Sequence, residues 1–121
     1  MGSLVLPAIC EFVPFSCYDS ALDCIRAQTE DCSVTEVSIT KNLTLLERNY
    51  KEEPGVQHVG FYIEGARYFC EENGLPYTGK VRIDQIVTKM LEVDTKSTPA
   101  ILDIVLPILA DYKLDEIEFP T

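Results

Sequence analysis

The stretch from Val56 to Leu91 constrains the fold more than any other part of the chain. Its first half is apolar around most of a helical circumference, and Gln57, Glu64 and Glu71 form a single polar stripe at a seven-residue spacing. This pattern is typical of a helix that is buried on more than one side. We therefore predict a buried central helix in the first half of the stretch.

The end of this helix and the start of a second one are also marked. Gly74 suits the left-handed position after a helix, Leu75 supplies the apolar contact that often follows, and Pro76 cannot continue the helix. After this turn, apolar residues recur at helical spacing, at Ile83, Ile86, Val87, Met90 and Leu91. The stretch is expected to form a helical hairpin that makes the wall of a core or of a cavity.

The segment from 34 to 46 fits two structures. Ser33 and Glu36 stand at the spacing of a capping box, which predicts the start of a helix. Apolar and polar residues also alternate from Val37 to Leu45, which is equally typical of a half-buried strand. We retain a helix because a solitary strand has no evident partner elsewhere in the chain.

The remaining segments complete an expected all-α fold, a compact bundle of about five helices around an apolar core or cavity. Residues 19–32 are expected to form the first helix. An apolar last helix is expected to begin at Pro99, with Thr98 as its N-cap and a kink at Pro107. Residues 49–55 are interpreted as a surface loop and residues 1–3 as an expression scar, so that residues 4–121 form a single helical domain.

Charge and hydropathy exclude several classes of partner. With 20 acidic and 10 basic side chains the net charge is −10, which repels phosphate backbones and anionic lipid surfaces. No apolar run approaches the roughly 20 residues that cross a bilayer. We therefore expect neither nucleic-acid binding nor membrane insertion.

The five cysteines bear on the compartment. Cys17 and Cys24, if they share a helix, are about 10 Å apart and too distant for a bridge. A long-range bridge between Cys24 and Cys70 is our first choice, because it would staple the first helix to the central one. The pairing of Cys10, Cys17 and Cys32 stays open, and the odd thiol offers a route to a homodimer. The alternative is a set of reduced, buried cysteines in a cytosolic domain.

No catalytic signature is present. His58 is the single histidine and has no recognisable motif with a serine or cysteine, and the cysteine spacing does not suit a structural zinc site. We predict that the protein is not an enzyme and holds neither a cofactor nor a metal. His58 has two interpretations, a solvated residue at the start of a helix or a pH switch.

Two segments resemble the insect odorant- and pheromone-binding proteins and their arthropod relatives, CIRAQTEDCSVTE from Cys24 and FYIEGARYFCEENGLPYTGKVRIDQIV from Phe61. In this resemblance Cys24 matches the first family cysteine and Cys70 the third, and Gly74, Leu75 and Gly79 match the turn that follows. The chain departs from the family at Ala66, which replaces the second cysteine. The resemblance implies a small, acidic, secreted, all-helical carrier of an odorant, a pheromone or another hydrophobic molecule.

The expected function is accordingly that of an extracellular carrier, which would bind a volatile or a fatty derivative in an internal cavity. The alternative is a secreted acidic helical protein-interaction domain, an effector or inhibitor, with a protein receptor and no small ligand. The cavity of the carrier is expected to be lined by apolar residues of the central hairpin, the last helix and the tail. These candidate ligand-binding residues are Phe61, Gly65, Phe69, Ile86, Met90, Ile104, Ile108, Tyr112 and Phe119.

Overall fold

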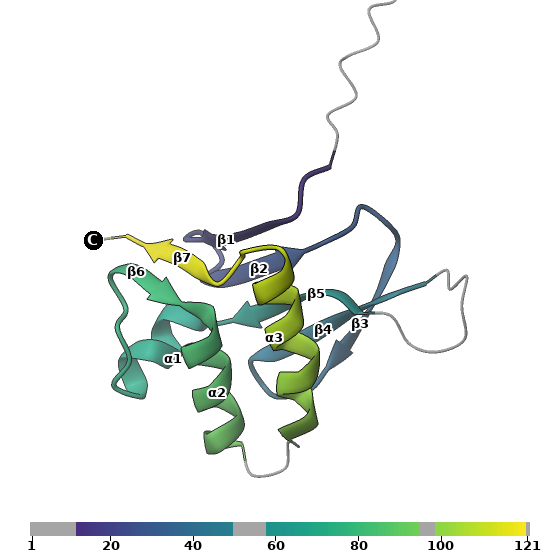
Figure 1. The fold of residues 1–121 in the computed structure, drawn as a ribbon. Coiled ribbons are helices and arrows are strands. Elements are labelled where there is room, and N and C mark those ends of the chain that lie inside the picture. The colour runs from purple at the N-terminus through teal and green to yellow at the C-terminus, as the bar shows by residue number, and fades with distance from the viewer. Residues whose placement is uncertain (1–11, 50–57, 95–98, 121) are drawn as a thin grey trace, which may run out of the picture.

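The chain folds mainly as β-structure, in a computed structural model that describes residues 12–49, 58–94 and 99–120 (Figure 1). Over these ranges it has seven strands in two antiparallel sheets and three short α-helices, so the predicted all-α bundle is wrong. The larger sheet has the strand order β1-β2-β5-β4-β3, with β1 (Phe15–Asp19), β2 (Cys24–Gln28), β3 (Val34–Ser38), β4 (Leu43–Arg48) and β5 (His58–Glu64). The smaller sheet pairs β6 (Gly79–Arg82) with β7 (Glu116–Phe119). The α-helices are α1 (Ala66–Glu72), α2 (Ile83–Val93) and α3 (Leu102–Asp111), and the 3₁₀ turn η1 (Pro99–Ile101) precedes α3.

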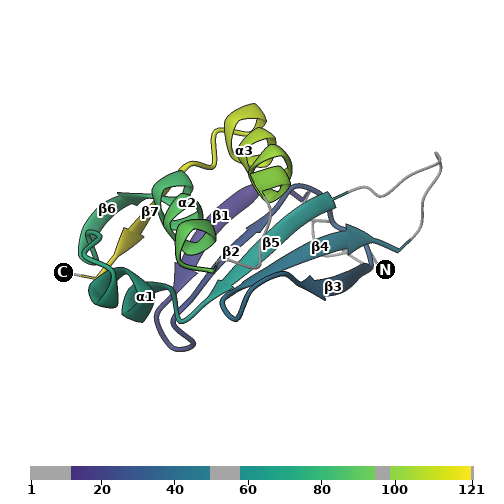
Figure 2. The same cartoon turned by 90° about the horizontal axis from the view of Figure 1, so that it is seen from below.

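α2 and α3 lie on one face of the larger sheet, which makes a two-layer arrangement, and α1 lies at the end of the sheet where β5 finishes (Figure 2). Because side chains alternate between the two faces of a strand, every second residue of the central strands faces this layer. The core consists of these residues together with the apolar stripes of the helices, and includes Ile25, Ala27, Leu43, Leu45, Phe61, Ile63, Ile86, Val87 and Val105. On the other face, the Arg26 guanidinium lies over the Tyr62 ring, 5.1 Å from its centroid.

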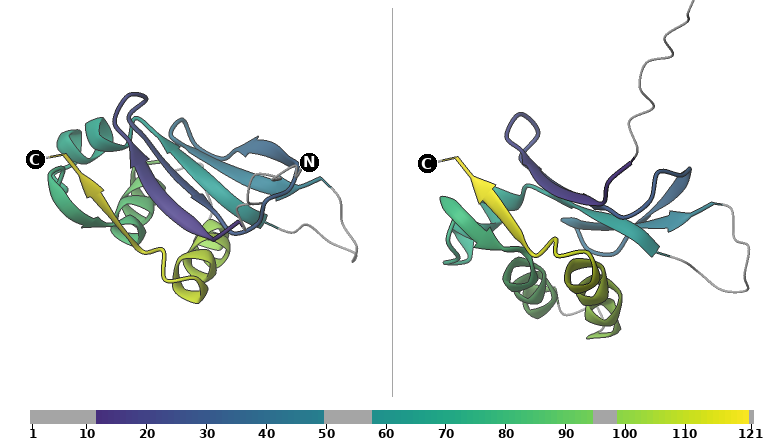
Figure 3. Two further views of the ribbon diagram at one scale, coloured as in Figure 1. Left: turned by 90° about the horizontal axis from the view of Figure 1, so that it is seen from above. Right: turned by 45° about the horizontal axis from the view of Figure 1, so that its top comes forward.

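The β6–β7 ribbon lies beside β1, at the edge of the larger sheet (Figure 3). Val81 and Ile117 are paired across the ribbon and both are buried. The Phe119 ring packs edge-on against the Tyr18 ring, with 4.7 Å between centroids. The last described strand therefore belongs to the same core as the first.

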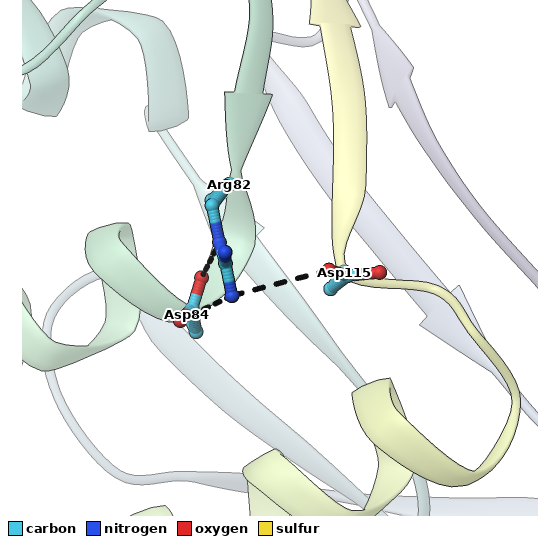
Figure 4. Close-up of polar contacts among 3 residues, drawn as sticks. All are labelled: Arg82, Asp84 and Asp115. Carbon is cyan, nitrogen blue, oxygen red and sulfur yellow. Dashed lines mark hydrogen bonds and ion pairs between the residues drawn. The ribbon is translucent and has the colours of Figure 1, made fainter.

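A polar contact joins the ribbon to the start of α2 (Figure 4). The Ile83 amide donates to the Asp115 carbonyl oxygen at 2.8 Å. The Arg82 guanidinium lies 3.0 Å from the Asp84 carboxylate and 4.0 Å from that of Asp115. These side chains are largely solvated, so the ion pairs contribute little to stability and mainly orient the strand end.

The predicted central helix is wrong over most of its length. His58 to Glu64 form β5, and Gly65, with a φ of 63°, turns the chain into the short helix α1. β5 is the middle strand of the sheet, and Gly60 and Tyr62 alternate with its core residues without adding charge. The strand consequently has the near-continuous apolar character of a buried helix.

The two N-terminal helices are also wrong. Residues 19–32 lie in the β1–β2 hairpin and the connection that follows it. The segment from 34 to 46 is the β3–β4 hairpin, so the strand alternative was the right one for this part of the chain. The partner that the sequence did not reveal is the next segment along the chain, which pairs with β3 in register from Val34 and Arg48 to Ser38 and Thr44.

The turn after Cys70 and the two helices predicted beyond it are confirmed, whereas Gly79–Arg82 and Glu116–Phe119 form strands that the sequence pattern does not predict. The Leu75 amide donates to the Cys70 carbonyl oxygen at 2.9 Å, and Gly74 has a φ of 73°, which together close α1 as a Schellman motif. The second helix of the stretch is α2, and it buries Ile83, Ile86, Val87 and Met90. The last helix is present with Pro107 inside it. Thr98, the expression scar at 1–3 and most of the expected 49–55 loop lie outside the described residues.

Candidate functional site

A groove opens between the turn after β3, the start of α1 and the end of α2. Its volume is about 880 Å³. We call it the α1–α2 groove. It is lined by Thr40, Lys41, Asn42, Glu64, Gly65, Tyr68, Phe69, Glu72, Asn73, Met90, Val93 and Asp94.

One wall of the groove is the β3–β4 turn, and local hydrogen bonds fix its shape. The Thr40 hydroxyl oxygen accepts from the amides of Asn42 at 3.1 Å and Leu43 at 2.9 Å. The Asn42 side-chain amide donates to the Glu64 carbonyl oxygen at 2.8 Å, and the Glu64 amide donates back to the Asn42 carbonyl oxygen at 2.7 Å. The turn is thus tied to the end of β5, and these hydrogen bonds fix the shape of the wall.

The opposite wall is α1, whose first turn is capped from another part of the chain. Gly65 offers no side chain for capping, and the Asp23 carboxylate takes that role from the β1–β2 turn. It accepts from the amides of Arg67 at 2.7 Å and Tyr68 at 3.2 Å, and from the Tyr18 hydroxyl at 2.7 Å. This cap fixes the start of the helix and therefore the position from which Tyr68 projects.

Arg67 holds the same helix to the ribbon. Its guanidinium donates to the carbonyl oxygens of Tyr77 at 2.9 Å and Pro120 at 2.9 Å. Asp23 and Arg67 together connect α1 to the first hairpin and to the end of the last strand. The helix has only seven residues, so these contacts substitute for the stability that a longer helix supplies itself.

The α1–α2 groove combines an apolar floor with an acidic rim. Phe69 and Met90 are buried at its base, whereas Tyr68 and Val93 remain 65% and 54% exposed. Among the described residues, its rim includes the acidic Glu64, Glu72 and Asp94 and the basic Lys41. An exposed aromatic ring among carboxylates is the arrangement that attracts an amphipathic cation, because the ring face and the carboxylates both favour positive charge.

A second, smaller groove of about 520 Å³ lies between α3 and the ends of the central strands. We call it the α3 groove. Within it, Arg48 is ion-paired with Glu30. The His58 Nε2 lies 3.7 Å from a carboxylate oxygen of Glu47, which is outside the lining. It is lined by Thr29, Glu30, Arg48, His58, Val59, Asp103, Ile104, Pro107, Ile108, Asp111 and Tyr112.

The structure divides the predicted ligand-binding residues among three places. Gly65, Phe69 and Met90 line the α1–α2 groove. Ile104, Ile108 and Tyr112 line the α3 groove. Phe61, Ile86 and Phe119 are at most 1% exposed and pack in the common core. The nine residues therefore do not form the wall of one cavity.

Sequence reasoning missed the residues that give the α1–α2 groove its character. Tyr68, Val93 and the β3–β4 turn are not among the predicted ligand-binding residues. The available signal was local, since Tyr68 is preceded by Arg67 and followed within four residues by Glu71 and Glu72. These neighbours indicate a groove only once the fold is known, because the turn at 40–42 that forms the other wall is distant in the sequence.

The predicted Cys24–Cys70 bridge is absent, since both residues are free thiols. Cys24 precedes the core residue Ile25 on β2, so its side chain points away from the helices, whereas Cys70 belongs to the core. The two thiols lie on opposite faces of the sheet. Burial raises the pKa of Cys24, and it raises the pKa of Cys70 from 9.0 to about 11.

Alkylation of the native protein should therefore proceed in a fixed order. Among the four cysteines in the described ranges, we expect the exposed Cys17 to react first, Cys32 next, and the buried Cys24 and Cys70 slowest, because the thiolate is the reacting form and burial disfavours it. Iodoacetamide labelling followed by peptide mapping measures the rates, and labelling in denaturant provides the control. Faster labelling of Cys70 than of Cys17 in the native protein would contradict this arrangement.

Stability should fall at alkaline pH. The pKa of Tyr18 is raised from 10.0 to about 12, mainly by burial and secondly by the hydrogen bond to Asp23. Burial raises the pKa of Cys70 to about 11. Both groups hold their protons more tightly in the folded state, so their contribution is complete below pH 9.0 and is lost between there and about pH 12. Urea denaturation across this range measures the loss. Tyr18→Phe should remove the upper part of the dependence and Cys70→Ala the lower part.

A metal site and a membrane-spanning helix were also considered within the described ranges. In residues 12–49, 58–94 and 99–120, His, Cys, Asp and Glu side chains do not form a group of three or more that could hold a metal ion. Within the same ranges, the helices lack the length and apolar character needed to cross a membrane. Comparison with family models, with curated proteins and with solved structures finds no match to this chain.

Proposed function

We propose that the protein is an acidic recognition domain that binds a cationic segment of another protein in the α1–α2 groove. The observation that carries this proposal is the presence of the exposed Tyr68 and Val93 beside the carboxylates of Glu64 and Glu72 in one groove. Apolar anchors surrounded by charge are the usual composition of a protein-binding site.

The charge of the whole chain supports the same class of partner. With a net charge of −10, the protein attracts cationic segments over distances limited by the Debye length, and it repels acidic ones. The groove adds selectivity, because a lysine or arginine side chain can place its methylene groups on Phe69 and Met90 and its charge among the carboxylates. The partner is thus a basic segment with apolar residues between its cations.

A labelled peptide tests the proposal. A fluorescein-labelled peptide of alternating lysine and valine should bind in fluorescence anisotropy, more tightly at low salt than at high salt, and the matching glutamate–valine peptide should not bind. Glu72→Lys should weaken binding roughly tenfold, since it reverses a charge on the rim. Glu71→Lys is the matched control, because Glu71 is the exposed neighbour on the same helix and does not line the groove. Equal losses in the two variants would contradict the groove as the site.

A small hydrophobic ligand is the second candidate. Gly65, Phe69 and Met90, which were predicted for a carrier, meet in the α1–α2 groove, and its volume suits a small molecule. An uncharged naphthylamine dye distinguishes the two functions. Saturable uptake at one site, lost on Val93→Glu, would favour the carrier, and displacement of the dye by the lysine–valine peptide would place both ligands in one groove. Extracellular localisation remains a prediction of the sequence.

A further inference from the structure

The outer edge of β3 is not paired with any strand in the part of the chain that the structure describes. Across the described ranges, β3 is hydrogen-bonded to β4 alone, whereas the opposite edge strand, β1, is flanked by β7. An open edge presents a row of backbone donors and acceptors that can receive another strand.

The hydrogen-bond pattern shows which residues present these groups. The Asn49 amide donates to the Ser33 carbonyl oxygen at 3.0 Å, and the Ile39 amide donates to that of Leu43 at 2.9 Å. In an antiparallel pair the bonded positions alternate, so residues 35 and 37 also bond toward β4. The N–H and C=O groups of Val34, Glu36 and Ser38 therefore point outward.

The open edge leads to the α1–α2 groove. β3 ends at Ser38, and the turn that follows it supplies Thr40, Lys41 and Asn42 to the wall of the groove. Two residues of extended chain span about 7 Å. A segment that is paired with Ser38 thus comes level with Thr40, a lining residue of the groove, two residues further on.

Charge selects what can occupy this edge. If a second copy paired antiparallel over the whole strand, Val34 would face Ser38 and Glu36 would face Glu36. Like charges directly opposite are destabilising, and both copies carry a net charge of −10. A strand with lysine or arginine opposite Glu36 has the complementary charge instead.

We propose that β3 receives the partner's cationic segment as an added strand, in line with the α1–α2 groove. This inference rests on the proposed function. The partner's backbone pairs with Val34, Glu36 and Ser38, and one of its cations faces the Glu36 carboxylate. The segment then continues into the groove, where its next apolar and cationic residues are bound.

Amide hydrogen exchange of the full chain tests the inference with the lysine–valine peptide as probe. The amides of Val34, Glu36 and Ser38 should become protected when the peptide is added. Thr35 and Val37, which already bond toward β4, should change little and serve as internal controls. If the peptide binds and Glu72→Lys weakens it while the three outward amides stay unprotected, the added strand is wrong and the groove proposal stands. If the peptide does not bind, both proposals fail.

Two substitutions separate backbone pairing from charge. Glu36→Pro removes an outward N–H while leaving the bonds to β4, and it should weaken peptide binding roughly tenfold. Glu36→Gln keeps the N–H and should weaken binding by a smaller factor. Far-UV circular dichroism checks that both variants fold. Equal affinity of Glu36→Pro and the unsubstituted protein would overturn the inference.

Discussion

Replacing Gly60 with alanine is expected to lower the free energy of unfolding by about 3 kcal/mol or more, the upper end of the range for overpacking a core. A Cβ atom at this position would lie far inside van der Waals contact of the Ala27 carbonyl oxygen, and 3.0 Å from the Gln28 Cα. Both obstacles are backbone atoms of β2, so relief requires the two central strands to separate. Because small domains are stable by only about 5–15 kcal/mol, this loss would be severe.

Urea denaturation followed by circular dichroism measures the effect. Gly79→Ala is the matched control, since Gly79 has a φ of 69° and no neighbouring atom within 4 Å of the added group. Its cost is that of the left-handed backbone, about 1–2 kcal/mol. If the two variants lose the same stability, the close approach of β2 and β5 at Gly60 is not a constraint on the fold.

Replacing Asp23 with alanine should have the second largest effect, a loss of about 2–3 kcal/mol. The substitution removes the acceptor of the Arg67 and Tyr68 amides and of the Tyr18 hydroxyl. It also places an alanine at a φ of 48°, a conformation that aspartate and asparagine tolerate better. The first turn of α1 would lose its cap, and the wall of the α1–α2 groove its support.

Asp23→Asn is the control for this prediction. Asparagine keeps one acceptor oxygen and suits the backbone conformation, so it should cost less than half as much as alanine. Tyr18→Phe isolates the hydroxyl contact, which should contribute about 1 kcal/mol. The stabilities are measured by urea denaturation at neutral pH. Equal stability of the alanine and asparagine variants would mean that the carboxylate does not cap α1.

The parts of the fold that could be predicted are those whose signal is complete within a short segment. The spacing of Ile83, Ile86, Val87 and Met90 defines α2 without reference to the rest of the chain, and Gly74 marks the end of α1 by its own backbone freedom. The strands differ, because a strand is defined by its neighbours. The helix predicted at β5 is wrong because Gly60 and Tyr62, which face away from the helices, place no charge between the core residues of the strand.

The candidate site could be predicted only in part for a similar reason. Phe69 and Met90 are apolar residues on helical faces, and a pocket prediction finds them without knowing the sheet. Tyr68 has no such signal, because nothing in its own segment shows that it stays exposed. The groove exists because the turn at 40–42 is bonded to the end of β5, and that contact joins segments 22 residues apart.

The packing of Phe119 on Tyr18 has a consequence for how the protein folds during its synthesis. The chain is made from its N-terminus, so the β1–β2 hairpin is available long before its last core neighbour. Before β7 has been synthesised, Phe119 cannot pack against Tyr18, and this edge of the larger sheet is uncovered. The uncovered edge can then associate with other chains. The acidic residues on β7, Glu116 and Glu118, alternate with its core residues and are exposed, so the closing strand is charged on its outer side. β7 thus completes the core with Ile117 and Phe119 and places two carboxylates on its outer side.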